Sequence, residues 1–183
     1  MKQELTVKDL VQSLRSDDAN KRTDSWLSAG EVGAQAIAPL ADLMVEGELE
    51  TSRAAKRGLW KIVRTIGAPG VSAQDKKAVL EALEGLLTSQ TDVAVRREVL
   101  WMLSEIADGE MAKQVGSFLT DVELREDARC SLERIPGPES LAILKGALDT
   151  VPDDFKMNIV QSLRARGVEV AGHPCQKLVP GKS

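Results

Sequence analysis

The sequence contains few of the residues from which catalytic and metal centres are usually built. Among its 183 residues there are one histidine, His173, and two cysteines, Cys130 and Cys175. His173 stands in a stretch without periodicity, so a Ser-His-Asp or Cys-His arrangement would depend on that one segment. The spacing matches no zinc motif, and neither an H-E-x-x-H sequence nor a glycine-rich phosphate loop is present. We therefore expect a non-enzymatic protein with no catalytic residues, no metal and no cofactor.

Long apolar runs and a surplus of positive charge are also missing. No run approaches the roughly 18 apolar residues that indicate a membrane-spanning helix, and the first stretch, MKQELTVKDLVQSL, lacks the apolar centre of a signal peptide. Two cysteines without framework spacing favour a reducing compartment. The net charge of −4 excludes a global positive field for nucleic acid or an anionic membrane. These features predict a cytoplasmic protein without membrane contact.

Helical periodicity is abundant, and it is clearest in residues 92–107, DVAVRREVLWMLSEIA. Asp92 is a candidate N-cap, because its carboxylate can accept from unpaired backbone N–H groups at the start of a helix. The apolar residues recur at intervals of three and four, which places them on one helix face. They are Val95, Val99, Met102, Leu103 and Ile106. One such helix cannot bury its own apolar face, so neighbouring helices are required.

The same pattern returns along the chain, which indicates internal repeats. A basic residue recurs with spacings of 34, 40, 29 and 31, and apolar or small residues follow it three and seven positions on. The basic row is Arg22, Lys56, Arg96, Arg125 and Lys156. We predict an array over residues 1–167, with repeats at approximately 5–33, 34–67, 72–108, 109–136 and 137–167, and an irregular tail over 168–183.

Residues 33–44, GAQAIAPLADLM, and the Asp-x-x-x-Arg start of the helix after Asp92 resemble HEAT repeats. The resemblance covers roughly residues 5–166. It implies an all-α fold, a right-handed α-α superhelix (solenoid) of about five HEAT-like helix pairs, whose second helices line the concave side. HEAT proteins usually bind protein partners on that side, although a few relatives bind nucleic acid or assist chromophore attachment.

The basic row permits two interpretations. It could form a ladder for anionic ligands, or it could pair with carboxylates at the turns of its own or adjacent repeats. Asp92 and Asp121 each precede a member of the row by four residues, and HEAT repeats use the position in this way. We favour the intramolecular interpretation.

A second basic cluster lies within residues 50–66, where the cations recur at helical spacing with no acidic residue between them. Neighbours of one sign at i, i+4 destabilise a helix slightly, so an external anion would compensate. In the repeat register Arg97 lies beside Arg57, and Trp101 lies beside Lys61. Such a site suits an acidic peptide segment or phosphate groups, although the cations could also simply be solvated. The candidate partner-binding residues are Arg53, Arg57, Lys61, Arg64, Arg97 and Trp101.

The three tryptophans receive different interpretations. Trp26 and Trp60 occupy equivalent repeat positions, and we expect both in the core or close to it. Trp101 is offset by one position, and we expect it at the surface, where aromatic side chains often anchor a partner.

The leading functional hypothesis is a protein-protein interaction module, or scaffold, that binds a possibly acidic partner segment on its concave face. The alternatives are a nucleic-acid-binding HEAT-like solenoid and an accessory protein resembling the HEAT-like chromophore lyases. The acidic net charge argues against nucleic acid, as do Glu126 and Glu133, which follow the basic cluster at equivalent positions of the fourth repeat.

Overall fold

The computed structural model describes residues 5–88 and 90–173. Within them the chain forms ten α-helices and two short 3-10 helices and no strand. The α-helices are α1 (Val7–Leu14), α2 (Ala19–Val32), α3 (Ile37–Glu46), α4 (Leu49–Ile66), α5 (Ala73–Gly85), α6 (Val93–Ile106), α7 (Gly109–Gly116), α8 (Arg125–Arg134), α9 (Pro138–Thr150) and α10 (Asp153–Ala165). The 3-10 helices are η1 (Gly33–Ala36) and η2 (Ser117–Thr120). Each predicted repeat range contains one pair of consecutive α-helices.

Five of the ten α-helices, α1, α2, α5, α6 and α7, begin where a side chain accepts from a free N–H group of the first turn. Thr6 and Asp9 form a capping box before α1, and Ser72 Oγ accepts from the Asp75 backbone N at 3.0 Å before α5. Asp92 Oδ1 accepts from the Ala94 backbone N at 2.8 Å, which confirms the predicted cap of α6.

The second helix pair begins with a 3-10 turn. Residues Gly33–Ala36 form η1, and the chain enters α3 at Ile37. Gly33 adopts a φ of 71°, which ends α2 in a conformation that favours glycine. Pro39 then lies in the first turn of α3, where its missing N–H leaves no intrahelical bond unmade.

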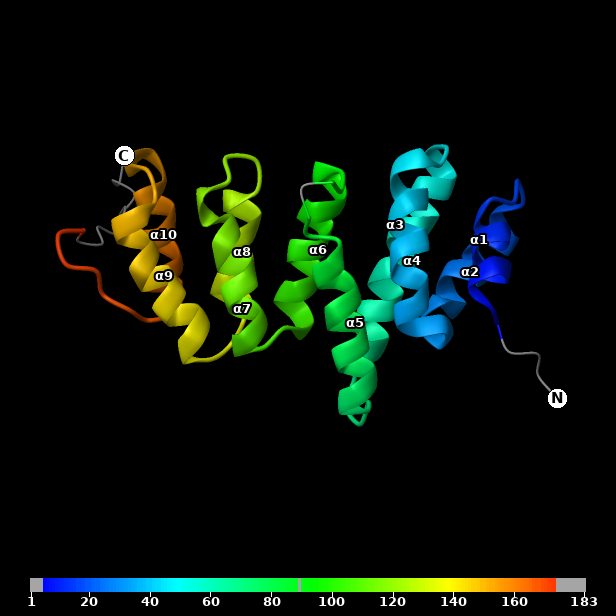
Figure 1. Cartoon of the computed structure of the whole chain (residues 1–183), viewed down its shortest axis with the longest axis horizontal. Helices are drawn as coiled ribbons and strands as arrows, with labels where there is room; N and C mark the ends of the chain where they lie inside the picture. Colours follow the sequence, from blue (N-terminus) through cyan, green and yellow to red (C-terminus); the bar gives the residue numbers. More distant parts are fainter. Residues whose placement is uncertain (1–4, 89, 174–183) are drawn as a thin grey trace, which may run out of the picture.

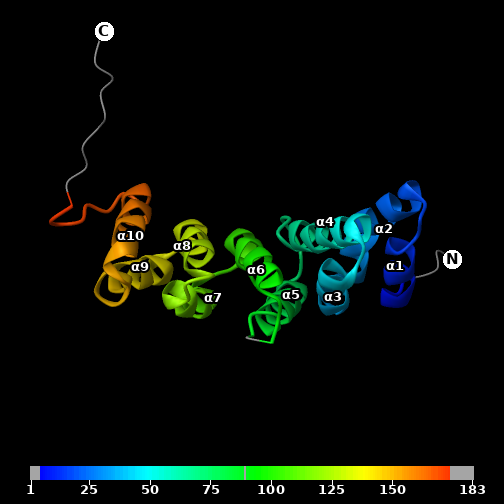
Figure 2. The same ribbon diagram turned by 90° about the horizontal axis from the view of Figure 1, so that it is seen from above.

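The helix pairs stack side by side into an elongated solenoid (Figure 1). Seen from above, the first helices of the pairs form one layer and the second helices form the other (Figure 2). The array is slightly curved, and the second-helix layer lies on its concave side (Figure 2). This layer consists of α2, α4, α6, α8 and α10. This arrangement confirms the all-α solenoid.

One hydrophobic core runs between the two layers, from Leu10 in α1 to Leu163 in α10. Because no pair buries its apolar faces alone, each pair completes the core of its neighbours. Hydrogen bonds also join adjacent repeats. The buried Ser131 hydroxyl of α8, for example, donates to the Leu100 carbonyl of α6 at 2.6 Å.

Arg166, which follows α10, joins the end of this helix to α8, to α9 and to the segment between them. Its guanidinium donates to the carbonyls of Leu132, Ile135 and Gly137 and to Ser140 Oγ, at 2.6–3.1 Å. Residues 168–173 contain no helix, and Val168 and Val170 pack against the core. The rest of the predicted tail, including Cys175, lies outside the described residues.

Candidate functional site

Helix α4 carries the strongest concentration of positive charge in the second-helix layer. Five of its 18 residues are basic and one, Glu50, is acidic. Its apolar residues recur at helical spacing, so one face is buried in the core and the cations are left on the opposite face. The buried face consists of Ala54, Ala55, Gly58, Leu59, Ile62, Val63 and Ile66.

The exposed face of α4 and one residue of α2 line a pocket of about 530 Å³. The lining residues are Trp26 from α2 and Arg53, Lys56, Arg57, Trp60, Lys61 and Arg64 from α4. The pocket therefore brings together four of the six predicted partner-binding residues.

Gly30 allows α2 and α4 to approach closely, and Gly58 allows α4 to approach α3. A Cβ on Gly30 of α2 would lie 3.0 Å from Thr65 Cβ of α4, closer than side chains normally approach. A Cβ on Gly58 of α4 would lie 3.2 Å from Leu40 Cδ1. The close approach places Trp26 beside the cations of α4.

Both indoles of the pocket are half-buried, and they pack against the core. The Arg57 guanidinium carbon lies 5.9 Å from the centre of the Trp26 ring, and that of Arg64 lies 5.4 Å from the Trp60 ring. A cation over an indole face is attracted by the negative face of the ring. The indoles thus restrain two of the cations in the pocket.

Carboxylates neutralise part of the positive charge. Arg53 Nη1 donates to Glu50 Oε1 at 2.8 Å on the same helix. Glu98 of α6 pairs with Lys56 and also accepts from Trp60 Nε1 at 3.0 Å. Arg57, Lys61 and Arg64 form no ion pair within the described part of the chain. Three uncompensated cations therefore share this pocket with two indoles.

The other two predicted site residues, Arg97 and Trp101 of α6, do not line the pocket. Arg97 Nη2 donates to the Glu123 carbonyl at 3.0 Å, and its Nε lies 3.6 Å from Asp127 Oδ2. Trp101 is half-buried, and its Nε1 donates to Asp127 Oδ1 at 2.8 Å. Asp127 of α8 holds both side chains toward the following repeat, away from α4.

The two tryptophans expected in the core or close to it lie against the core, as predicted, and they also line the pocket. Trp26 and Trp60 pack against the core on one side and line the pocket on the other, so sequence reasoning missed them as site residues. Their equivalent positions in adjacent repeats were the available signal. That signal indicates neighbouring side chains, but it does not show whether they are fully buried.

The basic repeat row is held within the protein, as the intramolecular interpretation predicts. Arg22 donates to the Ser16 and Asp17 carbonyls at 2.7 and 2.9 Å. Lys56 pairs with Glu98, Arg96 with Asp121 at 3.9 Å, Arg125 with Asp154 at 2.9 Å and Lys156 with Asp153 at 2.8 Å. Three of these pairs join one repeat to the next.

The positive surface ends at α8, where Arg129 is surrounded by carboxylates. Its guanidinium donates to Glu126 at 2.6 and 2.9 Å and to Glu133 at 3.0 Å, and Asn158 donates to Glu126 at 3.1 Å. The hydrogen bonds from Arg129 lower the pKa of Glu126, and those to Glu126 raise the pKa of Arg129. Burial raises the pKa of the neighbouring Cys130 thiol. The carboxylates therefore neutralise Arg129, whereas Arg134 in the last turn of α8 is exposed and forms no ion pair in the described residues.

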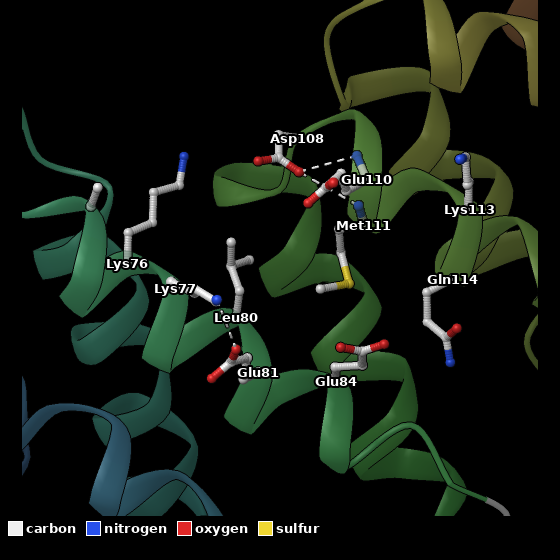
Figure 3. Close-up of a pocket in the computed structure, with 11 residues that line it drawn as sticks. Lys76, Lys77, Leu80, Glu81, Glu84, Asp108, Glu110, Met111, Lys113 and Gln114 are labelled. Atoms are coloured by element: carbon white, nitrogen blue, oxygen red, sulfur yellow. Dashed lines mark hydrogen bonds and ion pairs between the residues drawn. The ribbon is translucent and has the colours of Figure 1, made fainter.

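A second pocket, of about 540 Å³, lies between α5 and α7 in the first-helix layer (Figure 3). Leu80 and Met111 supply its apolar surface, and lysines and carboxylates surround them. Lys77 Nζ lies 3.7 Å from Glu81 Oε1, and Asp108 accepts from the backbone N of Glu110 at 3.2 Å. Because both signs of charge are present in similar number, this pocket favours neither an anion nor a cation.

Residues 5–88 and 90–173 contain neither a candidate metal site nor a helix that could span a membrane. No group of three or more His, Cys, Asp or Glu side chains is placed to hold a metal ion there. No helix in the same residues has the length and apolar character needed to cross a membrane.

Comparison with protein-family models and with curated proteins finds no match. Among solved structures, the chain is similar to a designed armadillo repeat protein in complex with the peptide (KR)4, with 16% sequence identity and a TM-score of 0.41. The similarity covers 87% of this chain and 81% of the designed protein.

Proposed function

We propose that this solenoid is a non-enzymatic interaction module that binds an acidic segment of a partner protein in the pocket around α4. The observation that carries the proposal is the convergence of Arg57, Lys61 and Arg64, all without an ionic partner in the described chain, on a pocket with two indole walls. Carboxylates of a bound segment would neutralise these cations.

The pocket favours an acidic segment for two physical reasons. Three positive charges close together repel one another. A bound anion is attracted to all three and offsets this repulsion. The indoles exclude water from one side of the arginines, which strengthens their hydrogen bonds to an anion. Trp26 and Trp60 also offer apolar contact to the side chains next to the carboxylates.

The extent of the positive surface favours a protein segment over a nucleic acid. Three cations without an ionic partner in the described residues cluster on α4, whereas Asp121 and Asp127 pair with Arg96 and Arg97 of α6, and carboxylates surround Arg129 of α8. A nucleic acid presents phosphates at every step and would need a longer basic track. A short acidic segment of a protein matches the single pocket.

A titration of the protein with a short peptide rich in Asp and Glu, followed by tryptophan fluorescence and calorimetry, tests the proposal. The matched peptide replaces these residues with Asn and Gln. We expect saturable binding of the acidic peptide only, loss of about 10-fold or more in affinity in the R57Q/K61Q variant, and weaker binding as salt increases.

The control variant K113Q/K145Q makes the same charge change on α7 and α9 in the other layer. It should bind like the wild type. Equal binding of both peptides, or equal loss in both variants, would overturn the proposal, as would tighter binding of a single-stranded oligonucleotide that depends on Arg57 and Lys61.

We further propose that the repeats are of the HEAT type. Each repeat consists of two antiparallel helices, and the basic row at the start of the second helices pairs within the array. Both features support the assignment that the sequence of residues 33–44 and 92–107 indicates.

A further inference from the structure

We infer that the anion for which the α4 pocket is selective is the phosphoryl group of a phosphorylated protein segment. This inference rests on the proposed function, because it names the chemical group that the acidic segment carries. It is drawn from the number, spacing and orientation of the free cations.

The number of free cations indicates an anion with more than one charge. Glu50 pairs with Arg53, and Glu98 pairs with Lys56, so three cations of the pocket have no carboxylate partner among residues 5–88 and 90–173. A single Asp or Glu side chain carries one negative charge and leaves most of this field uncompensated. A phosphorylated serine or threonine carries about −1.5 to −2 charges at neutral pH.

The spacing of the three cations also suits a phosphoryl group. Arg57, Lys61 and Arg64 stand at i, i+4 and i+7, so their side chains leave the same face of α4 as neighbours. A phosphoryl group has three terminal oxygens that accept hydrogen bonds, and it can therefore engage several donors at once. A carboxylate has only two oxygens, which lie in one plane, so it can accept from fewer of these donors.

The two arginines are held in orientations that suit this role. Each guanidinium lies over an indole, Arg57 over Trp26 and Arg64 over Trp60, and Lys61 stands between them along the helix. A guanidinium presents a planar fork of N–H donors that pairs with two phosphate oxygens, whereas the lysine ammonium acts as a point charge. Because stacking restrains the forks before binding, less side-chain entropy is lost when the phosphate arrives.

The surroundings of the pocket favour an isolated phosphate on a protein chain. On the side of the pocket that faces α6, Glu98 contributes a carboxylate. Asp127 of α8 pairs with Arg97 of α6 and adds a second carboxylate in this direction. A polynucleotide would bring its neighbouring phosphates toward these carboxylates, where they would be repelled. A peptide with one phosphate can place neutral residues there.

The experiment uses the full chain and three fluorescein-labelled peptides of the same Gly- and Ser-rich sequence. They differ at one central position, which is phosphoserine, aspartate or serine. Fluorescence anisotropy measures the three affinities, with inorganic phosphate and an oligo(dT) strand as competitors. We expect the phosphoserine peptide to bind about 10-fold or more tightly than the aspartate peptide.

Variants separate recognition of the phosphoryl group from simple charge attraction. The R57K/R64K variant retains the charge but loses both guanidinium forks, and its preference for phosphoserine over aspartate should fall several-fold. The K145Q variant removes a cation on α9 and should retain the wild-type preference. A thermal melt of each variant verifies that the protein remains folded.

The outcomes distinguish this inference from the proposed function. Equal affinity for the phosphoserine and aspartate peptides would overturn the inference, and the proposed function would stand if an Asp- and Glu-rich peptide binds. Failure of all acidic peptides would overturn both. An unchanged phosphoserine preference in R57K/R64K, or stronger competition by oligo(dT) than by the phosphopeptide, would also overturn the inference.

Discussion

At the scale of single residues, Glu98 controls how much positive charge the α4 pocket presents. Its carboxylate pairs with Lys56 and accepts from Trp60 Nε1 at 3.0 Å. The E98Q variant retains an acceptor for the indole N–H but removes the negative charge. We expect roughly 3- to 10-fold tighter binding of an acidic peptide, measured by calorimetry, because one more cation is left free.

E105Q is the matched control for this substitution, since Glu105 is an exposed residue of the same helix. It should change the affinity much less than E98Q. Weaker binding in E98Q would show that the carboxylate mainly positions Trp60 and Lys56, which would contradict the electrostatic explanation.

The Glu126 network predicts a pH-dependent contribution to stability. The pKa of Glu126 is lowered in the folded protein, chiefly by hydrogen bonds from Arg129, so folding favours the ionised carboxylate. Its contribution is complete above the usual glutamate pKa of about 4.3 and is lost as the pH falls through the lower folded value. Urea unfolding should show wild type more stable than E126Q at neutral pH, with the difference disappearing in acid. A difference that is constant across this pH range would contradict the assignment.

Residue patterns in the sequence anticipated the cations of the pocket but not all of its composition. Arg53, Arg57, Lys61 and Arg64 belong to one helix, and their common face follows from helical spacing. The position of the Arg97 side chain depends on the carboxylate with which it pairs, and this partner, Asp127, belongs to the next repeat. The sequence contains no local signal for that choice.

At the scale of helices, the close approach of α2 and α4 depends on Gly30. A Cβ at this position would lie 3.0 Å from Thr65 Cβ, and Thr65 is fixed by a hydrogen bond from its hydroxyl to the Lys61 carbonyl at 2.8 Å. The G30A variant should therefore separate the two helices and lose about 1–3 kcal/mol of stability in urea unfolding.

G146A provides the control, because Gly146 lies within α9 and a Cβ there would meet no atom of the described residues within 4 Å. Alanine favours the helix more than glycine does, so G146A should be neutral or up to about 1 kcal/mol more stable. Equal effects of the two substitutions would show that the α2–α4 contact is not tightly packed at Gly30.

The starts of α1 and α5 could be predicted because each depends on residues close in sequence. The Thr6 and Ser72 caps each use a partner three residues away. The 3-10 turn at Gly33–Ala36 could not be predicted in this way. The apolar spacing continues through it, and the backbone conformation of Gly33 is set by how α2 and α3 pack.

At the scale of the whole molecule, the number of helix pairs could be predicted because every repeat must bury the same kind of apolar face. Three of the five members of the basic row pair with a carboxylate of the following helix pair, so the row joins neighbouring pairs. The shallow curvature depends on small differences in how each pair packs on its neighbour. These differences reflect the shapes of many side chains and leave no periodic pattern.

A linear array of this kind predicts that damage at one end stays local. Leu103 of α6 and Leu163 of α10 occupy equivalent positions, seven residues after the basic row, and both are fully buried. Truncation to alanine costs about 2–5 kcal/mol at such sites. Because repeats contact only their neighbours, L163A should increase hydrogen exchange in α9 and α10 and leave α1 to α4 close to wild type. L103A, in the central repeat, should increase exchange in the repeats on both sides. Hydrogen-exchange mass spectrometry distinguishes these patterns, and a uniform loss of protection in L163A would show that the five pairs unfold as one cooperative unit.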